Sequence, residues 1–381
     1  MKKRSVRLLL LLLVLAIGAA ALAWVAPKLK RRFYTHGLNV VTVARGLETP
    51  WALAFLPDGR MLVTERPGRM RIIERDGRVG PPLDGVPPVW AQGEGGLLDV
   101  ALDPQFAQNQ RVYWSYAEPD PAGGPGASTA IARGRLEGTR LADVQVIYRQ
   151  PQKTGDVRHF GSRLLFAPDG SLFVGLGDRM LRDEAQALSS AHGKILRLQP
   201  DGSAPPDNPF AGRPGALAEI WSYGHRNVQG LAWQPQTGAL WASEHGPSGG
   251  DELNLIERGR NYGWPVITYG REYSSLAKIG EGSAKPGMEQ PVLWWAPEST
   301  PPSALLFVTG DRYPEWQGQL LVATFRNGAF TRVKLDGRKA VETETIYLAG
   351  NERVRDLKLG PDGWIYLVVN APEGRILRLA K

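Results

Sequence analysis

The chain has 381 residues and a formal net charge of +8, from 46 Lys and Arg against 38 Asp and Glu. It contains no cysteine, which excludes disulfides, thiolate nucleophiles and cysteine-ligated metals. Residues 1–32 hold eight of the basic residues and no acid, so the rest of the chain is formally neutral. It lacks the basic excess typical of a nucleic-acid-binding protein, and we expect no nucleic-acid partner.

The first predicted element is an apolar segment at residues 8–26, which is uncharged over 19 positions. At ~1.5 Å per residue it is just long enough to cross a ~30 Å hydrocarbon core. It is either a signal peptide, cleaved after Ala21-Leu22-Ala23, or an uncleaved inner-membrane anchor followed by basic residues at 28–32. Both interpretations make residues 1–36 an export segment and predict a periplasmic or extracytoplasmic location for residues 37–381.

The remainder of the chain is rich in turn formers and shows no sustained helical period, which indicates an all-β fold. A repeated pattern of apolar strand, Pro-Asp-Gly type turn and second apolar strand begins at six positions: Trp51, Leu97, Arg163, Gln229, Ser303 and Arg355. Six such units favour a six-bladed β-propeller over residues 37–381. A parallel solenoid is the alternative, but its repeats would be shorter and more regular.

Two clusters lie beside the third and fourth repeats. His159 precedes the third unit, and Asp178 ends the hairpin of that unit, so the two could meet as a general base and its orienting carboxylate. Arg226 and Asn227 precede the fourth unit and supply donors suited to carboxylates or carbonyl oxygens. The alternatives are a surface histidine with a turn aspartate, and a loop salt bridge.

Two further clusters follow along the chain. In residues 244–254, glycines bend the chain so that backbone carbonyls can converge near Asp251 and Glu252, an oxygen-rich setting for a hard cation such as Ca²⁺. At the sixth unit, Arg353 and Arg355 fall on the same side of a predicted strand. A plain polar loop and a solvated strand face are the respective alternatives.

Taken together, the clusters resemble the soluble pyrroloquinoline-quinone-dependent aldose sugar dehydrogenases of the glucose/sorbosone dehydrogenase family. The resemblance runs from about Leu47 to Leu379. Its most specific pieces are His-Phe-Gly-Ser-Arg-Leu, Gly-His-Arg-Asn-x-Gln-Gly, Glu-His-Gly-Pro-x-Gly-Gly-Asp-Glu-Leu-Asn and Arg-x-Arg-Asp. It implies a six-bladed propeller, export from the cytoplasm, and pyrroloquinoline quinone (PQQ) and Ca²⁺ as cofactors.

The resemblance also assigns catalytic roles. It makes His159 the base that removes the proton from the anomeric hydroxyl of the sugar, with Asp178 as the carboxylate that orients this histidine. It makes Arg226 the residue that polarises the quinone carbonyl. The implied reaction oxidises an aldose at its anomeric carbon to a lactone by hydride transfer to PQQ, and electrons then pass to an acceptor that the sequence does not identify.

The remaining implied roles concern the cofactors. Asn227, Arg353 and Arg355 resemble PQQ-binding positions. Gly246 and Pro247 resemble the positions whose carbonyls hold the Ca²⁺ beside the quinone, and Glu252 and Tyr262 resemble a second, structural calcium site. Two PQQ-binding positions depart from the family pattern: Glu94 stands where Gln is common, and Arg326 stands where many members have Lys.

Two other functions remain open at this stage. One is a non-catalytic, exported propeller that binds a glycan or a protein. The other is a Ca²⁺-dependent propeller lactonase, although the sequence shows no cluster of carboxylates and Asn around a single cation site.

Overall fold

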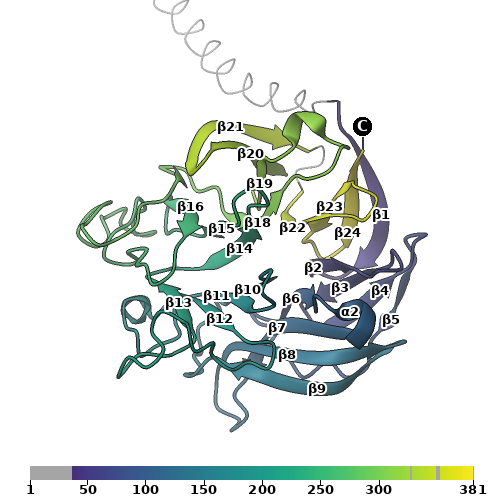
Figure 1. The fold of residues 1–381 in the computed structure, drawn as a ribbon, viewed down its shortest axis with the longest axis horizontal. Helices are drawn as coiled ribbons and strands as arrows, with labels where there is room; N and C mark the ends of the chain where they lie inside the picture. The colour runs from purple at the N-terminus through teal and green to yellow at the C-terminus, as the bar shows by residue number, and fades with distance from the viewer. Residues whose placement is uncertain (1–36, 327, 349–351, 381) are drawn as a thin grey trace, which may run out of the picture.

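The computed structural model describes residues 37–326, 328–348 and 352–380. They form six four-stranded antiparallel sheets arranged as blades around a central axis (Figure 1). The predicted all-β, six-bladed propeller is therefore confirmed. None of the helices within these residues has the length and apolar character that a membrane span requires. The apolar segment predicted at residues 8–26 lies outside the described residues.

The first three blades follow the chain order, with the innermost strand first. Their strands are, in blade 1, β2 (Pro50–Phe55), β3 (Met61–Glu65), β4 (Arg69–Ile73) and β5 (Val79–Pro82); in blade 2, β6 (Leu97–Leu102), β7 (Arg111–Pro119), β8 (Ala127–Glu137) and β9 (Arg140–Arg149); and in blade 3, β10 (Gly161–Phe166), β11 (Leu172–Leu176), β12 (Lys194–Leu198) and β13 (Ile220–Tyr223).

The other three blades continue the ring. Their strands are, in blade 4, β14 (Val228–Trp233), β15 (Leu240–Glu244), β16 (Asp251–Ile256) and β17 (Leu293–Trp295); in blade 5, β18 (Pro302–Phe307), β19 (Leu320–Thr324), β20 (Ala329–Asp336) and β21 (Lys339–Tyr347); and in blade 6, β22 (Val354–Leu359), β23 (Ile365–Val369), β24 (Gly374–Ala380) and β1 (Asn39–Leu47). Short helices are α2 (Phe106–Asn109) and the 3₁₀ helices η1 (Arg182–Ala185) and η2 (Pro314–Trp316).

Each predicted repeat forms the first two strands of one blade. In three of the six, a Pro-Asp-Gly turn joins the pair, and its glycine has a positive φ of 85° at Gly59, 83° at Gly170 and 79° at Gly363. The N–H of Gly59 donates to the carbonyl of Leu56 at 2.9 Å, and the other two turns close in the same way. Glycine adopts this conformation without steric cost, which is why the repeat carries it.

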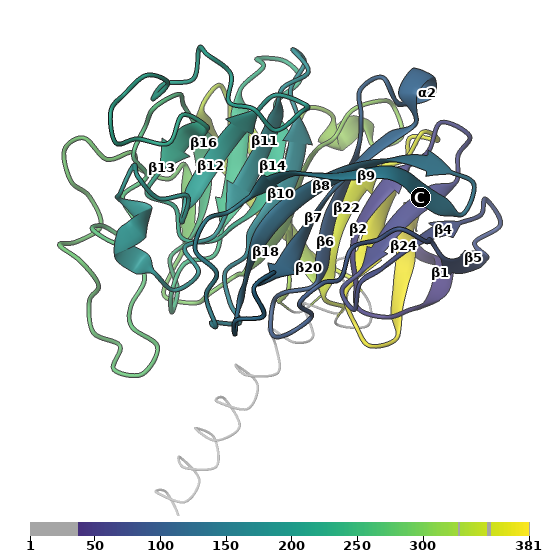
Figure 2. The same cartoon turned by 90° about the horizontal axis from the view of Figure 1, so that it is seen from below.

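The ring closes by pairing both ends of the described chain. β1 runs antiparallel to β24, from Asn39 opposite Ala380 to Leu47 opposite Gly374, and completes the blade formed by β22 and β23. In Figures 1 and 2 the purple β1 lies beside the yellow strands of blade 6. The last blade is thus built from residues more than 300 positions apart.

The apolar core is divided among the six interfaces between neighbouring blades, each with its own buried cluster. Where the innermost strands meet, Arg163 on β10 is buried and polar. Its guanidinium contacts four other innermost strands: Asp99 on β6 (3.2 Å), the carbonyl of Gln229 on β14 (2.8 Å), the carbonyl of Ser303 on β18 (2.8 Å) and Asp356 on β22 (3.0 Å). The backbone N–H of Leu53 on β2 donates to Asp356, so all six blades join this network.

Candidate active site

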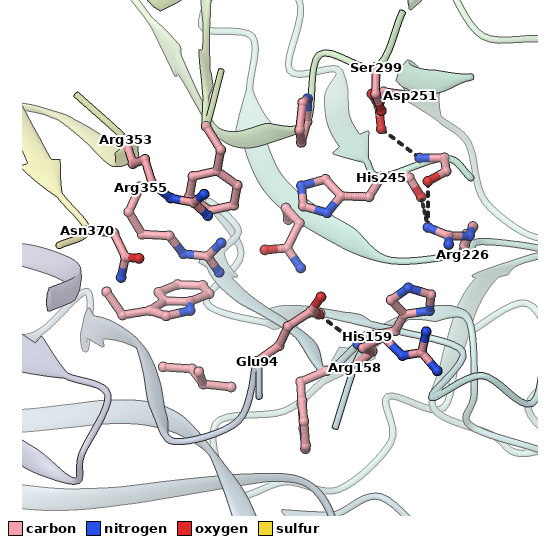
Figure 3. A pocket seen from close by; sticks show the side chains of 18 of the residues that line it. Glu94, Arg158, His159, Arg226, His245, Asp251, Ser299, Arg353, Arg355 and Asn370 are labelled. Atoms are coloured by element: carbon pink, nitrogen blue, oxygen red, sulfur yellow. Dashed lines mark hydrogen bonds between the residues drawn. The ribbon is translucent and has the colours of Figure 1, made fainter. Parts of the chain in front are cut away.

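A cavity of about 800 Å³ opens where the segments that precede the innermost strands meet the segments that follow the second strands. Seven of the predicted site residues line it: Glu94, His159, Arg226, Gly246, Arg326, Arg353 and Arg355. Figure 3 labels Glu94, His159, Arg226, Arg353 and Arg355 among the lining side chains. Asp178 and Asn227 are buried directly behind its wall. The fold therefore gathers residues from five blades that are widely separated in the sequence.

His159 and Asp178 meet as predicted, with Nδ1 of the imidazole 2.7 Å from Oδ1 of the carboxylate. Asp178 is fully buried, while His159 faces the cavity. Burial alone would raise the pKa of Asp178, but the hydrogen bond with His159 and the charge of Arg226 outweigh it and lower that pKa. A carboxylate that stays charged at neutral pH can hold Nδ1 as a donor, which leaves Nε2 free to accept a proton.

The backbone around this pair is left-handed at several non-glycine residues, with φ of 57° at His159, 81° at Ser162, 50° at Arg179 and 63° at Met180. Such conformations cost of order 1 kcal/mol or more each and persist only where the surroundings impose them. Gly177 shows how closely the segments approach, because a Cβ there would lie 1.9 Å from the carbonyl oxygen of His159.

Arg179 supplies much of this constraint, and sequence reasoning gave it no role. Its guanidinium is fully buried, lies 3.5 Å from the centre of the Phe160 ring, and donates to the carbonyls of Arg158, Ala127 and Asp156. Burial lowers its pKa to about 10. Arg179 therefore ties the loop that carries His159 to the segment that carries Asp178.

The two donors predicted before the fourth unit differ in their contacts. Nη1 of Arg226 donates to the carbonyls of Gly246 (2.6 Å) and His245 (3.0 Å) at the cavity wall. Oδ1 of Asn227 instead accepts hydrogen bonds from the backbone of Gly161 and the side chain of Gln229. Asn227 therefore anchors the turn beside His159, whereas Arg226 faces the cavity.

Arginines and aromatic rings form the opposite wall. The guanidinium of Arg355 lies 3.9 Å from the centre of the Trp51 ring, and that of Arg353 lies 4.7 Å from the centre of the Phe325 ring. Arg353 is exposed at the mouth, while Arg355 is 7% exposed. Burial, followed by repulsion from Arg163, holds the pKa of Arg355 well below its usual range. An anionic ligand at this wall would relieve that cost.

The two departures from the family pattern both have local partners. Oε2 of Glu94 accepts the backbone N–H of His159 at 2.8 Å, so the carboxylate holds the histidine's backbone. Arg66, unassigned by sequence reasoning, donates to the carbonyls of Gly93 and Gly95 on either side. Arg326 pairs with Glu298 at 2.9 Å and donates to the carbonyl of Ser299 at 2.7 Å.

The four predicted metal residues, Gly246, Pro247, Glu252 and Tyr262, line one small cavity of about 10 Å³. That volume suits a single ion or water. The side-chain amide of Asn254 donates to both Glu252 and the buried Glu244. Burial, followed by repulsion from Glu244, raises the pKa of Glu252 well above its ordinary value. The described residues contain no group of three or more His, Cys, Asp or Glu able to hold a metal, so carbonyl oxygens would supply most ligands.

The hydroxyl of Tyr262 is already engaged, because it donates to the carbonyl of Leu255 at 2.6 Å and accepts the N–H of Glu257 at 2.8 Å. Tyr262 could therefore contribute only its backbone carbonyl to a cation. The backbone carbonyls of Gly246, Pro247 and Tyr262 and the carboxyl group of Glu252, with Glu244 close by, match the oxygen preference of Ca²⁺.

His245 also lines the cavity and was not predicted as a site residue. Its Nε2 donates to the carbonyl of Pro302 at 2.8 Å. Burial, followed by repulsion from Arg355 and Arg226, lowers its pKa to about 3. A neutral histidine adds a hydrogen-bonding group to the wall without adding charge. Its position beside Gly246 in the sequence was the available signal.

The lining as a whole suits a small polyanion. It includes seven arginines against two acids, Glu94 and Asp251. Within the described part of the chain, the buried Nε atoms of Arg226 and Arg355 have no hydrogen-bond partner. PQQ carries three carboxylates, so these residues fit it as a ligand.

The comparisons with known proteins point the same way. The sequence model of the family described as glucose / sorbosone dehydrogenase matches residues 47–378. The aldose sugar dehydrogenase of Escherichia coli K12 is 41% identical over 373 residues, which cover 97% of either chain. Quinoprotein glucose dehydrogenase B of Acinetobacter calcoaceticus is 27% identical over 415 residues, covering 88% of this chain and 85% of its own.

Solved structures agree with this match. The PQQ-bound aldose sugar dehydrogenase of Streptomyces coelicolor superposes with a TM-score of 0.74 at 32% identity, covering 91% of this chain and 99% of that one. The apo-form of the E. coli enzyme gives a TM-score of 0.85 at 41% identity, covering 90% and 99%.

Proposed function

Because the chain belongs to the glucose/sorbosone dehydrogenase family, we propose that it is a quinoprotein that oxidises aldose sugars at the anomeric carbon. The observation that carries this proposal is the His159–Asp178 pair, which opens into a cavity lined by seven arginines. The pair supplies a base, and the arginines supply a site for an anionic cofactor. A protein that only bound a glycan would have no need of either.

Two sets of residues would hold the cofactors. Arg326, Arg353 and Arg355, which line the large cavity, would bind the carboxylates of PQQ. The backbone carbonyls of Gly246 and Pro247, which line the small cavity, would bind Ca²⁺. When bound, PQQ accepts the hydride from the anomeric carbon, so that the sugar becomes a lactone and the quinone is reduced. An external acceptor of unassigned identity reoxidises it.

The protein's own residues act on the proton and on developing charge. Nε2 of His159 takes the proton of the anomeric hydroxyl, and Asp178 stabilises the imidazolium that forms. Arg226 places a fixed positive charge beside the cavity, where it would stabilise negative charge on the quinone carbonyl of bound PQQ. Trp51 and Phe325 pack their rings against the guanidinium of the buried Arg355 in the cavity wall.

A spectral titration tests the cofactor assignment. We expect cofactor-free protein to give a saturable absorbance change with PQQ that requires Ca²⁺, and then to reduce a dye on addition of an aldose. His159→Ala should retain the absorbance change and lose nearly all dye reduction. Saturable PQQ binding with no turnover on any aldose would rule out the sugar dehydrogenase, and no binding would rule out the quinoprotein.

We also propose that the protein acts outside the cytoplasm, on the strength of the apolar residues 8–26 and their basic flanks. Cell fractionation with mass measurement of the mature protein tests this. A periplasmic form lacking about the first 23 residues supports a cleaved signal, a full-length membrane-bound form supports an anchor, and a cytosolic form contradicts both.

A further inference from the structure

Trp264 lies behind the His159–Asp178 pair and outside the large cavity. The residue is 4% exposed, and its indole Nε1 donates a hydrogen bond of 2.8 Å to Oδ2 of Asp178. The other carboxylate oxygen, Oδ1, contacts Nδ1 of His159 at 2.7 Å and accepts the backbone N–H of Met180 at 2.9 Å. The two oxygens therefore have different partners, and the indole N–H binds the one that does not contact the histidine.

The indole is itself held by hydrogen bonds to its backbone. The N–H of Trp264 donates to the carbonyl of Gly224 at 2.9 Å, and Nε2 of Gln186 donates to the carbonyl of Trp264 at 2.7 Å. Gln186 and Asn261 exchange hydrogen bonds through their side-chain amides, and Asn261 also accepts the N–H of Gly263. With its backbone fixed on both sides, the donor stays in place if the carboxylate rotates.

We propose that Trp264 is a positioning residue for this pair: its N–H fixes the carboxylate of Asp178 so that Oδ1 keeps the Nδ1 proton of His159. This inference rests on the proposed function, because it concerns the base of the proposed reaction. A neutral imidazole has one donor and one acceptor nitrogen, so holding the proton on Nδ1 leaves Nε2 available as the base. The N–H also stabilises a carboxylate that is cut off from water.

Other charged and titratable groups surround the pair from several elements: Glu94 before β6, Arg179 and Arg182 after β11, His192 before β12, Arg226 before β14 and His245 after β15. Of the described residues, Trp264 alone donates to Oδ2 of Asp178. Removing the indole N–H thus leaves that oxygen buried without a partner.

A test of this role must remove the indole N–H of Trp264 while keeping an aromatic ring in its place. The Trp264 ring lies 5.3 Å from the guanidinium carbon of Arg226, so its complete removal would disturb a second site residue. Trp264→Phe keeps an aromatic face and removes the donor. Trp241→Phe is the matched control, because Trp241 is also buried in blade 4 and its Nε1 donates to Gln234 at 3.2 Å, away from the cavity.

The first measurement uses protein without cofactor. In a protein labelled with ¹⁵N-histidine, the Nδ1 proton of His159 is the signal that disappears in His159→Gln. We expect that proton to exchange with solvent ~10-fold faster in Trp264→Phe, the size of one lost hydrogen bond to a charged group, and to be unchanged in Trp241→Phe. Equal exchange in the two variants overturns the inference.

The second measurement uses protein saturated with PQQ and Ca²⁺. Trp264 lines the small cavity of the predicted metal residues but not the large one, so the comparison is made at saturating PQQ and Ca²⁺. For Trp264→Phe we expect kcat ~10-fold lower with the sugar KM within ~2-fold of wild type. The acid limb of the pH–rate profile, where the His159–Asp178 pair gains a proton, should move up by ~0.5–1 pH unit. The reason is that the Asp178 carboxylate, with one donor fewer, makes the pair bind a proton more strongly. An unchanged kcat and pH profile contradicts the proposal.

The outcomes for the two proposals remain distinct. If the wild-type protein shows no turnover, the proposed function fails, but the exchange of the Nδ1 proton still decides the role of Trp264. If Trp264→Phe does not fold, Gln186→Met removes the donor to the Trp264 carbonyl instead. We then expect faster exchange in the same direction, and unchanged exchange overturns the inference.

Discussion

The carboxylate of Asp178 is buried completely, yet its pKa is lowered. A buried acid ordinarily becomes neutral, so its charge must be maintained by its partners. The hydrogen bond with His159 and the charge of Arg226 lower the pKa of Asp178 and keep it ionised. The ionised carboxylate then holds the proton of the imidazole on Nδ1. At the scale of single residues, the site therefore depends on a charge that is never exposed to substrate.

Asp178→Asn tests that dependence. The amide can donate to Nδ1 and so favours the tautomer with the proton on Nε2, which removes the base, and we expect kcat to fall by ~10²–10⁴ with little change in sugar KM. Dye reduction at saturating PQQ and Ca²⁺ measures this. Asp169→Asn is the control, since Asp169 lies in the same hairpin with its side chain 55% exposed. A similar kcat in the two variants would contradict the assignment.

Glu94→Gln separates the two effects of the carboxylate at that position. A Gln oxygen can still accept the backbone N–H of His159, while the negative charge in the cavity is removed. We expect PQQ to bind ~3–10-fold tighter at low salt, with kcat nearly unchanged. Spectral titration at two salt concentrations measures this. Weaker PQQ binding would show that the charge itself is required.

At the scale of elements, the connection between β11 and η1 positions Asp178 against the loop of His159. It contains Gly177, Asp178, Arg179 and Met180, two of which are left-handed. Its fixed shape lets one segment contact the loop of His159 on one side and the backbone of Arg226 on the other.

Gly177→Ala should therefore inactivate the protein while leaving the ring folded. The new Cβ would meet the carbonyl oxygen of His159 at 1.9 Å and force the histidine to move. We expect dye reduction to fall at least ~10²-fold, with circular dichroism unchanged. Gly155→Ala is the control, because its Cβ would meet only the carbonyl oxygen of Pro125 at 3.8 Å. Full activity in Gly177→Ala would show that the loop can shift without cost.

The segment from η1 to β12 should make stability depend on pH. Burial, followed by repulsion from Lys194, lowers the pKa of His192 from 6.5 to about 4. Between these values the unfolded chain binds the proton and the folded chain does not, so stability is lost as the pH falls from about 6.5 toward 4, by at most ~3 kcal/mol. Urea midpoints should fall over this window and fall less in His192→Gln. Equal slopes would contradict this account.

At the scale of the whole molecule, Arg163 is the point where all the blades meet. Replacing it by Met leaves Asp99 and Asp356 buried together without their shared cation. We expect a loss of ~3–5 kcal/mol in the free energy of unfolding, measured by urea denaturation. Arg332→Met, which breaks an ion pair on an outer strand with Glu344, should cost ~1 kcal/mol or less. Equal losses would show that the central network adds nothing.

The sequence predicts the inner half of each blade well and the outer half poorly. Inner strands repeat because they are buried on both faces and joined by tight turns, so their pattern survives in every copy. Outer strands such as β13 and β17 are three or four residues long and follow long loops, and no local signal marks them. The pairing of β1 with β24 is likewise invisible, because pairing over such a separation leaves no trace in either segment.

The site residues likewise fall into those that the sequence could indicate and those that it could not. Residues within recurring motifs, such as His159 and Arg226, could be selected in advance. Arg66 and Trp264 could not, because their importance comes from contacts with segments far away in the chain. The segments around Glu94 and Arg326 indicated two residues that line the cavity, but they could not show that nearby groups already engage both charges.

The closure of blade 6 has a consequence for biosynthesis. Strand β24 lies between β23 and β1, so β1 has no neighbour in its sheet until residues 374–380 have been made. Of the described strands, β24 is the last to leave the ribosome, and until it does the nascent chain is an open arc with an unpaired strand at its beginning. The ring thus delays its own completion until the chain has been synthesised.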